Sequence, residues 1–149
     1  MRVSTLSFAA LLFGLTTAAT VYAQSSEQVV KLPNEIEFKA PLNPGAPAGA
    51  SLYGSPSKAG LYVNRVKFTP GFKVMPHFHP DERTVVVLSG TFYMGLGEQF
   101  DESKMKAYPP GTFLSEPAQM PHYTWAKDGE VIIQITGIGP SGSTQIPQN

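Results

Sequence analysis

Short runs of apolar and β-branched residues follow one another through the second half of the chain, and turn residues separate them. Several runs alternate between apolar and polar positions, and they end at glycine, proline or an Asp-Gly pair. This pattern is typical of the strands of an all-β sandwich or barrel. The expected strands are 61–68 (LYVNRVKF), 84–88 (TVVVL), 91–96 (TFYMGL), 112–116 (TFLSE), 122–126 (HYTWA) and 131–138 (VIIQITGI).

Two of the turns between these runs carry hairpin signals. Ser89-Gly90 separates the second run from the third, and Asp128-Gly129 separates the last two. Both predict that the flanking strands pair in a tight hairpin. Only 100–105 (FDESKM) favours a helical turn, because its acids precede its lysine.

The first residues form a different pattern. A positive charge at Arg2 precedes an apolar run at 6–15, and small residues follow at Val21 and Ala23. This is the pattern of a secretory signal peptide, and the apolar run is too short to cross a bilayer. We expect residues 1–23 to be removed and the mature protein to be secreted or periplasmic, without membrane attachment. An uncleaved anchor is the alternative.

The remaining 126 residues (149 − 23) are enough for one domain with one core. Residues 24–60 are interpreted as an N-terminal extended arm, since 40–60 is dense in Pro, Gly and Ala. The barrel is expected at 61–139, and a C-terminal tail at 140–149.

Composition excludes several classes of site and partner. The chain has no cysteine, which rules out thiolate metal sites and thiol catalysis. Removing Arg2 from its 11 basic residues leaves 10 against 11 acidic ones. The mature chain therefore lacks the positive charge with which proteins bind nucleic acid or anionic lipid. A small molecule or a saccharide is the expected partner.

The chain has three histidines, His77, His79 and His122. His77 and His79 are two residues apart, so on a strand their side chains point to the same face. Imidazole nitrogen suits Zn, Cu, Fe and Ni, and His122, which opens another expected strand, would supply a third ligand. The alternative, from spacing alone, is that these histidines are structural or exposed.

Two stretches around the histidines resemble the two motifs of the cupin family. The resemblance covers 61–139 and implies a small double-stranded β-helix, or jelly-roll, barrel that forms homodimers. It also implies a metal inside the barrel, held by His77, His79 and His122. The first stretch is Gly71-x5-His77-x-His79-x3-Arg83-x6-Gly90, and the second is Gly111-x5-Pro117-x-Gln119-x2-His122.

Arg83 stands where the family has a glutamate as its fourth metal ligand. Arginine has no lone pair to offer a cation, so two arrangements are open. Either three histidines leave open positions, as in catalytic metal sites, or a bulge brings Glu82 inward as a ligand. An inward Arg83 would hold an anionic or carbonyl-bearing substrate. The alternative role for Arg83 is an ion pair with Glu82, Glu116 or Asp81.

Strand parity adds further candidates to the site. Val85 and Val87 share the parity of Arg83 and would line an apolar pocket floor, and Thr124 is in phase with His122 and would orient a bound water. Arg83 and Glu82 are the catalytic candidates. Arg83, Val85, Val87 and Thr124 are the candidates for substrate binding.

These features together favour a secreted metal-binding enzyme with one divalent transition metal. Iron or copper with open positions would suit oxidative, dioxygenase-type chemistry on a small molecule or a saccharide. Zinc or nickel would suit isomerisation, hydrolysis or lyase chemistry, and manganese is a further alternative for the metal. Since a fold does not fix a function, a non-catalytic periplasmic ligand-binding or sensory module is the alternative.

Overall fold

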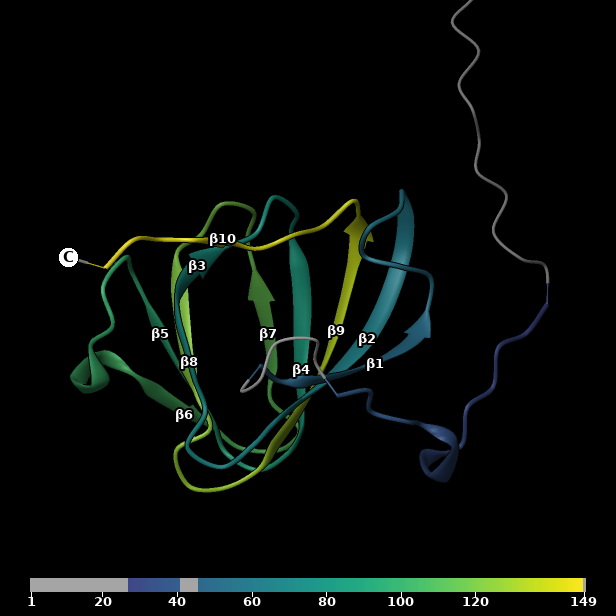
Figure 1. Cartoon of the computed structure of the whole chain (residues 1–149), viewed down its shortest axis with the longest axis horizontal. Helices are drawn as coiled ribbons and strands as arrows, with labels where there is room; N and C mark the ends of the chain where they lie inside the picture. Colours follow the sequence, from purple (N-terminus) through teal and green to yellow (C-terminus); the bar gives the residue numbers. More distant parts are fainter. Residues whose placement is uncertain (1–26, 41–45, 149) are drawn as a thin grey trace, which may run out of the picture.

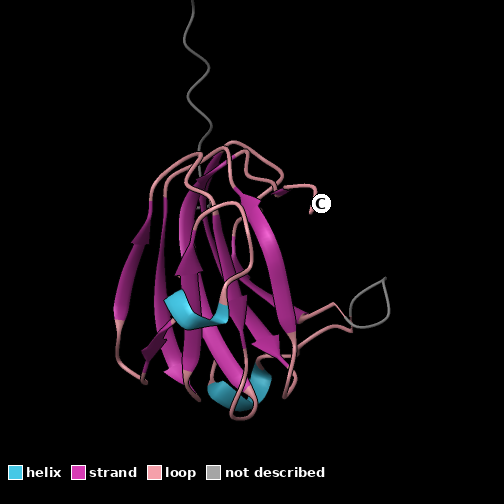
Figure 2. Cartoon of the chain, turned by 90° about the vertical axis from the view of Figure 1, so that its left-hand side faces the viewer, coloured by secondary structure: helices cyan, strands magenta, loops and turns pink. Residues whose placement is uncertain are grey.

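Two antiparallel sheets of five strands face each other in the computed structural model, which describes residues 27–40 and 46–148 (Figures 1 and 2). The expected signal peptide at 1–23 lies outside these residues. Across the described ranges, no helix has both the length and the apolar character needed to cross a membrane. The predicted all-β jelly-roll barrel is confirmed.

Each sheet draws strands from distant parts of the chain. Sheet A has the order β1-β2-β9-β4-β7, and sheet B has the order β10-β3-β8-β5-β6. Sheet A consists of β1 (Ala48–Tyr53), β2 (Gly60–Phe68), β9 (Val131–Gly139), β4 (Arg83–Ser89) and β7 (Phe113–Glu116). Sheet B consists of β10 (Thr144–Gln145), β3 (Lys73–Phe78), β8 (His122–Trp125), β5 (Phe92–Leu96) and β6 (Lys106–Tyr108). Two 3₁₀ turns, η1 (Pro33–Glu35) and η2 (Glu102–Lys104), complete the described elements, and η2 falls within the predicted helical turn.

Both predicted hairpins are wrong. Strands β4 and β5 lie in different sheets, and so do β8 and β9. Gly90 has φ +73°, and a side chain there would collide with the Glu130 carbonyl. The two turns therefore lie against each other where the chain crosses between the sheets. A turn signal predicts only a change of chain direction. The strands that each flanking strand pairs with are decided by packing, because the apolar faces of both strands must meet across the core.

The barrel extends beyond residues 61–139 at both ends. Strand β1 lies inside the segment interpreted as an arm and pairs with β2. Strand β10 lies inside the segment interpreted as a tail and pairs with β3, with Gln145 opposite His77. In Figure 1, β10 crosses the upper end of the barrel.

Inward-facing side chains fill the barrel in layers. The lower layers are apolar and include Phe68, Phe92, Val85 and Val87. The uppermost layer is polar. On sheet A the strand register places Tyr62, Gly137, Arg83 and Glu116 side by side. On sheet B the same layer holds His77 paired with His122.

Candidate metal centre

The three histidines converge at the upper end of the barrel. His77 lies near the end of β3, His79 directly follows that strand, and His122 opens β8. Their ligand atoms all lie within 4.8 Å of one another, and the side chains are buried, with exposed fractions of 6%, 6% and 1%. The shortest distance between ring centroids is 4.3 Å, between His77 and His122. The three histidines that the sequence predicted as metal ligands therefore lie together in the fold.

Each imidazole is oriented by a backbone carbonyl. The Nδ1 atoms of His77, His79 and His122 lie 2.9, 2.5 and 3.0 Å from the carbonyl oxygens of Met75, Gly142 and Met120. A carbonyl only accepts hydrogen bonds, so Nδ1 carries the proton and Nε2 keeps its lone pair.

The Nε2 atoms behave as ligands without a partner. Those of His79 and His122 are buried, and no hydrogen-bond partner reaches them from the residues that the structure describes. A buried polar atom without a partner is costly, and a metal ion would satisfy it. The donor set thus fits one divalent transition metal of the kind that imidazole binds.

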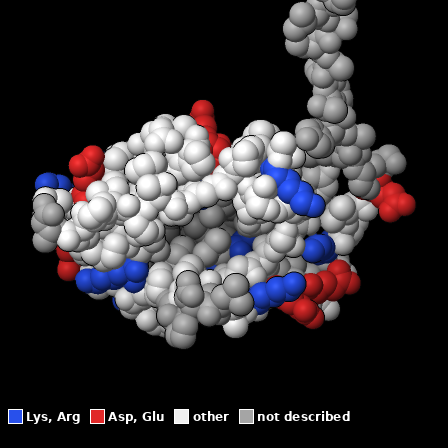
Figure 3. All heavy atoms as spheres, turned by 45° about the horizontal axis from the view of Figure 1, so that its top comes forward, with Lys and Arg blue, Asp and Glu red and all other residues white. Residues whose placement is uncertain are grey.

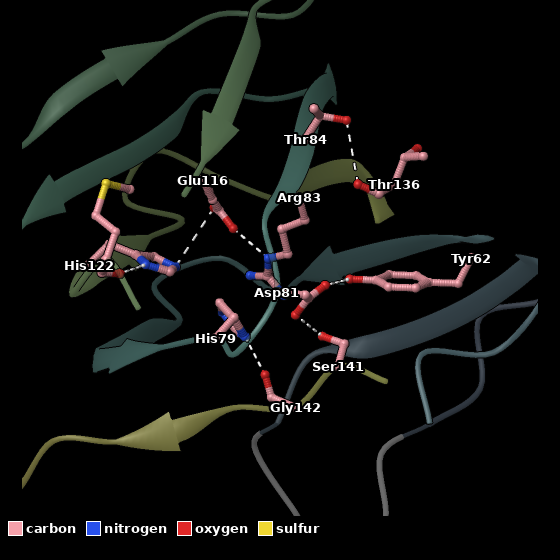
Figure 4. Close-up of polar contacts among 11 residues, drawn as sticks. Tyr62, His79, Asp81, Arg83, Thr84, Glu116, His122, Thr136, Ser141 and Gly142 are labelled. Carbon is pink, nitrogen blue, oxygen red and sulfur yellow. Dashed lines mark hydrogen bonds and ion pairs between the residues drawn. The ribbon is translucent and has the colours of Figure 1, made fainter. Parts of the chain in front are cut away.

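The Gly142 carbonyl is held in place by a small polar network. Asp81, between β3 and β4, accepts hydrogen bonds from the Tyr62 hydroxyl at 2.8 Å and the Ser141 hydroxyl at 2.6 Å (Figure 4). The network ties the segment after β9 to the loop that follows His79. Gly137 permits it, because a Cβ there would lie 2.6 Å from the Tyr62 hydroxyl oxygen.

Arg83 points into the barrel, as predicted, and forms an ion pair with Glu116. Its Nε donates to Glu116 Oε2 at 2.5 Å, and the two side chains are 12% and 3% exposed. The two residues are opposite each other on β4 and β7. Among the described residues no acceptor reaches the two terminal amino groups of Arg83, so they remain free for another anion.

Glu116 also lies beside the histidine cluster. Its second oxygen, Oε1, is 3.7 Å from His122 Nε2, and Figure 4 shows its carboxylate between Arg83 and His122. The sequence named Glu116 only as one of three acids that could pair with Arg83. The available signal was parity, since Glu116 shares the inward side of its strand with Leu114.

The other predicted residues are placed less centrally. Glu82 is exposed, and the pairing of β4 is regular at this end, so no bulge turns Glu82 inward. Val85 and Val87 lie in the core with exposed fractions of 0% and 1%. Thr124 is buried one layer below His122, opposite Met94.

Burial sets the protonation of two of the histidines. Loss of solvent is the largest cause that lowers the pKa of His77 to about 4, and repulsion from His122 adds to it. The pKa of His79 also falls to about 4, through burial first and the nearby Arg83 charge second. Both rings are therefore neutral, and able to bind a metal, throughout the physiological pH range.

This shift predicts acid sensitivity of the metal-free protein. Unfolded histidine takes up a proton near pH 6.5, while His77 and His79 in the fold resist protonation until about pH 4. The unfolded state binds more protons between these values, so stability is lost as pH falls from about 6.5 to about 4. Urea unfolding across this range measures the loss. A His77→Gln/His79→Gln variant should lose less over the same range, and an equal slope would contradict the assignment.

The cluster lies at the upper end of the barrel. Figure 3 views the molecule with this end brought forward, and a hollow opens there with basic side-chain atoms on its wall. Acidic side chains lie around the outside of the same view.

Solved structures share this architecture at low sequence identity. RemF, a polyketide cyclase from Streptomyces resistomycificus, superposes with a TM-score of 0.69 at 16% identity, over 83% of this chain and 88% of that one. An RmlC-like cupin from Shewanella frigidimarina gives 0.59 at 15%, over 75% and 91%. A recombinant oxalate oxidase in complex with glycolate gives 0.57 at 20%, over 74% and 60%. No family model and no curated protein matches the chain.

Proposed function

We propose, on the premise that the chain has the cupin fold of its structural neighbours, that it is an exported metal-dependent enzyme. Its substrate would be a small molecule with an anionic or carbonyl group, and an acidic saccharide also qualifies. The observation that carries the proposal is the meeting of three clustered imidazoles, two of which have buried Nε2 atoms without a partner, with an arginine whose amino groups are free.

In this proposal one set of residues binds the metal and another binds the substrate. His77, His79 and His122 would hold one divalent metal, and iron or copper would supply open coordination positions and oxidative, dioxygenase-type chemistry. The free amino groups of Arg83 offer the planar, paired donors that suit a carboxylate. Glu116 fixes the direction of that guanidinium through its Nε. The apolar layer below, with Val85 and Val87, excludes water from the floor of the site.

A small carboxylate is a reasonable first probe. One structural neighbour is an oxalate oxidase described in complex with glycolate. Both oxalate and glycolate carry the group that the Arg83 fork would bind.

The test begins with metal analysis of protein purified from its native compartment, followed by titration with oxalate and glycolate. Carboxylate binding is followed by the absorption or paramagnetic resonance of the metal, and turnover by an oxygen electrode. Arg83→Ala should retain the metal but bind the carboxylates about 10- to 100-fold more weakly, as expected for a lost charge-assisted hydrogen bond.

Three further results test the proposed roles in the site. Arg83→Lys should not restore binding, because lysine lacks the planar fork. Unchanged carboxylate affinity in Arg83→Ala would contradict the proposed role of Arg83. Carboxylate binding without turnover of any substrate would favour the alternative, a ligand-binding or sensory module.

A further inference from the structure

We propose that Glu116 is a fourth protein ligand of the metal, binding through Oε1 while Arg83 holds Oε2. The inference rests on the metal centre of the proposed function and adds a ligand to it. It also places a carboxylate on β7, opposite the strand position where the first motif carries Arg83.

The first argument is that His122 Nε2 and Glu116 Oε1 face each other with no donor between them. His122 Nδ1 donates to the Met120 carbonyl, so in the metal-binding, neutral form of the ring His122 Nε2 presents a lone pair. Glu116 Oε1, a carboxylate oxygen, presents another at 3.7 Å. Two buried acceptors that face each other without a donor repel, and a cation between them turns the repulsion into binding.

The second argument is the spacing. Nitrogen and oxygen ligands lie about 2.0–2.2 Å from an ion such as zinc, so two ligands of one ion are roughly 3–4 Å apart. The separation of Oε1 from His122 Nε2 falls within that range. Glu116 lies at the edge of the cluster, beside His122, and its carboxylate must move inward to complete the site.

The third argument is charge. Imidazole ligands are uncharged when they bind a metal, so three of them do not offset a dication, and Arg83 adds a further buried positive charge beside them. Glu116 is the buried carboxylate of this layer, with 3% exposure. A carboxylate that bridges the arginine and the metal offsets part of both charges, which makes binding of the ion less costly in this layer.

The bridge also gives Arg83 a specific task. With its Nε engaged by Oε2, Arg83 fixes the rotation of the carboxylate and so the direction of Oε1. Arg83 is in this respect a positioning residue for the metal site. A glutamate at 116 without Arg83 would retain the ligand atom but lose its orientation.

The experiment measures affinity of the metal-free protein for Zn²⁺ by competition with a chromophoric chelator, and the absorption spectrum of bound Co²⁺. Glu116→Gln should weaken Zn²⁺ binding by about 100-fold or more, since even outer partners of metal ligands contribute 10- to 100-fold, and should alter the Co²⁺ spectrum. Glu82→Gln removes an exposed carboxylate beside Arg83 and is the matched control. It should bind within a few-fold of the parent.

A second pair of variants separates ligation from the loss of the ion pair. Arg83→Gln keeps the Glu116 carboxylate and should keep most of the Zn²⁺ affinity. The double variant Arg83→Gln/Glu116→Gln leaves neither residue of the ion pair as an unpaired buried charge, and it should lose most of the Zn²⁺ affinity. Circular dichroism confirms that each variant folds. Equal Zn²⁺ affinity in the parent and the double variant, with an unchanged Co²⁺ spectrum, would overturn the inference. Failure of the parent to bind Zn²⁺ or Co²⁺ would overturn the proposed metal centre instead.

Discussion

A His122→Ala variant is expected to bind no stoichiometric metal, with affinity reduced by at least about 100-fold. His122 is the most buried of the three imidazoles, at 1% exposure, and its Nε2 lies in the cluster without another partner among the described residues. Because loss of even an outer partner costs 10- to 100-fold in affinity, loss of a direct ligand should cost more. Elemental analysis after dialysis against metal-free buffer measures the result.

The control for this variant is Thr124→Ala. Thr124 is the next inward residue of the same strand and is also buried, so its replacement removes a side chain from the same face without removing a ligand. It should keep the metal at parental occupancy. Full metal occupancy in His122→Ala would show that the ligand set is wrong.

The largest loss of stability is expected from Phe92→Ala. Phe92 opens β5, is 2% exposed and lies 6.1 Å, between ring centroids, from Phe68 in the core. Truncating a buried phenylalanine leaves a cavity and costs about 3–5 kcal/mol. Small domains have only about 5–15 kcal/mol of stability in total, so the variant should be close to unfolding at physiological temperature. Urea denaturation followed by circular dichroism gives the free energy.

Phe113→Ala is the matched control, since Phe113 opens β7 on the outer face of the barrel and is 64% exposed. Removing the same side chain there should change stability by about 0.5 kcal/mol or less. Similar losses in the two variants would mean that the core is not where the strand parity places it.

Local patterns were sufficient to predict the histidine cluster. His77 and His79 share a face by parity, and His122 was the remaining histidine, at the start of another expected strand. The motif spacing that resembles the cupins then pointed to all three as ligands. The barrel fold that the resemblance implies is confirmed, and solved cupin structures share it. Strand parity also correctly predicted that Arg83, which has no lone pair to ligate a metal, points inward. These inferences needed only period-two alternation and short spacings.

The features that could not be predicted from the sequence depend on which residues of distant strands lie opposite each other. Glu116 is 33 residues from Arg83 in the chain and becomes its partner only through the pairing of β4 with β7. The crossing at Gly90 was mistaken for a hairpin because turn residues specify a reversal and not the sheet that follows. The polar segment after β9 carries no apolar pattern, so its pairing with β3 and its carbonyl to His79 were also hidden.

The short strand β10 has a consequence for how the metal exchanges with solution. It contains two residues, both exposed, and short exposed elements open more readily than the core of a barrel. If this opening extends to the Ser141–Asp81 hydrogen bond, it withdraws the Gly142 carbonyl from His79 and frees that ring to rotate, while the sheets stay closed. We therefore expect metal release to follow opening of this segment, on a faster timescale than global unfolding. Amide hydrogen exchange at Ile146, whose N–H donates to the Pro76 carbonyl, would report on that opening.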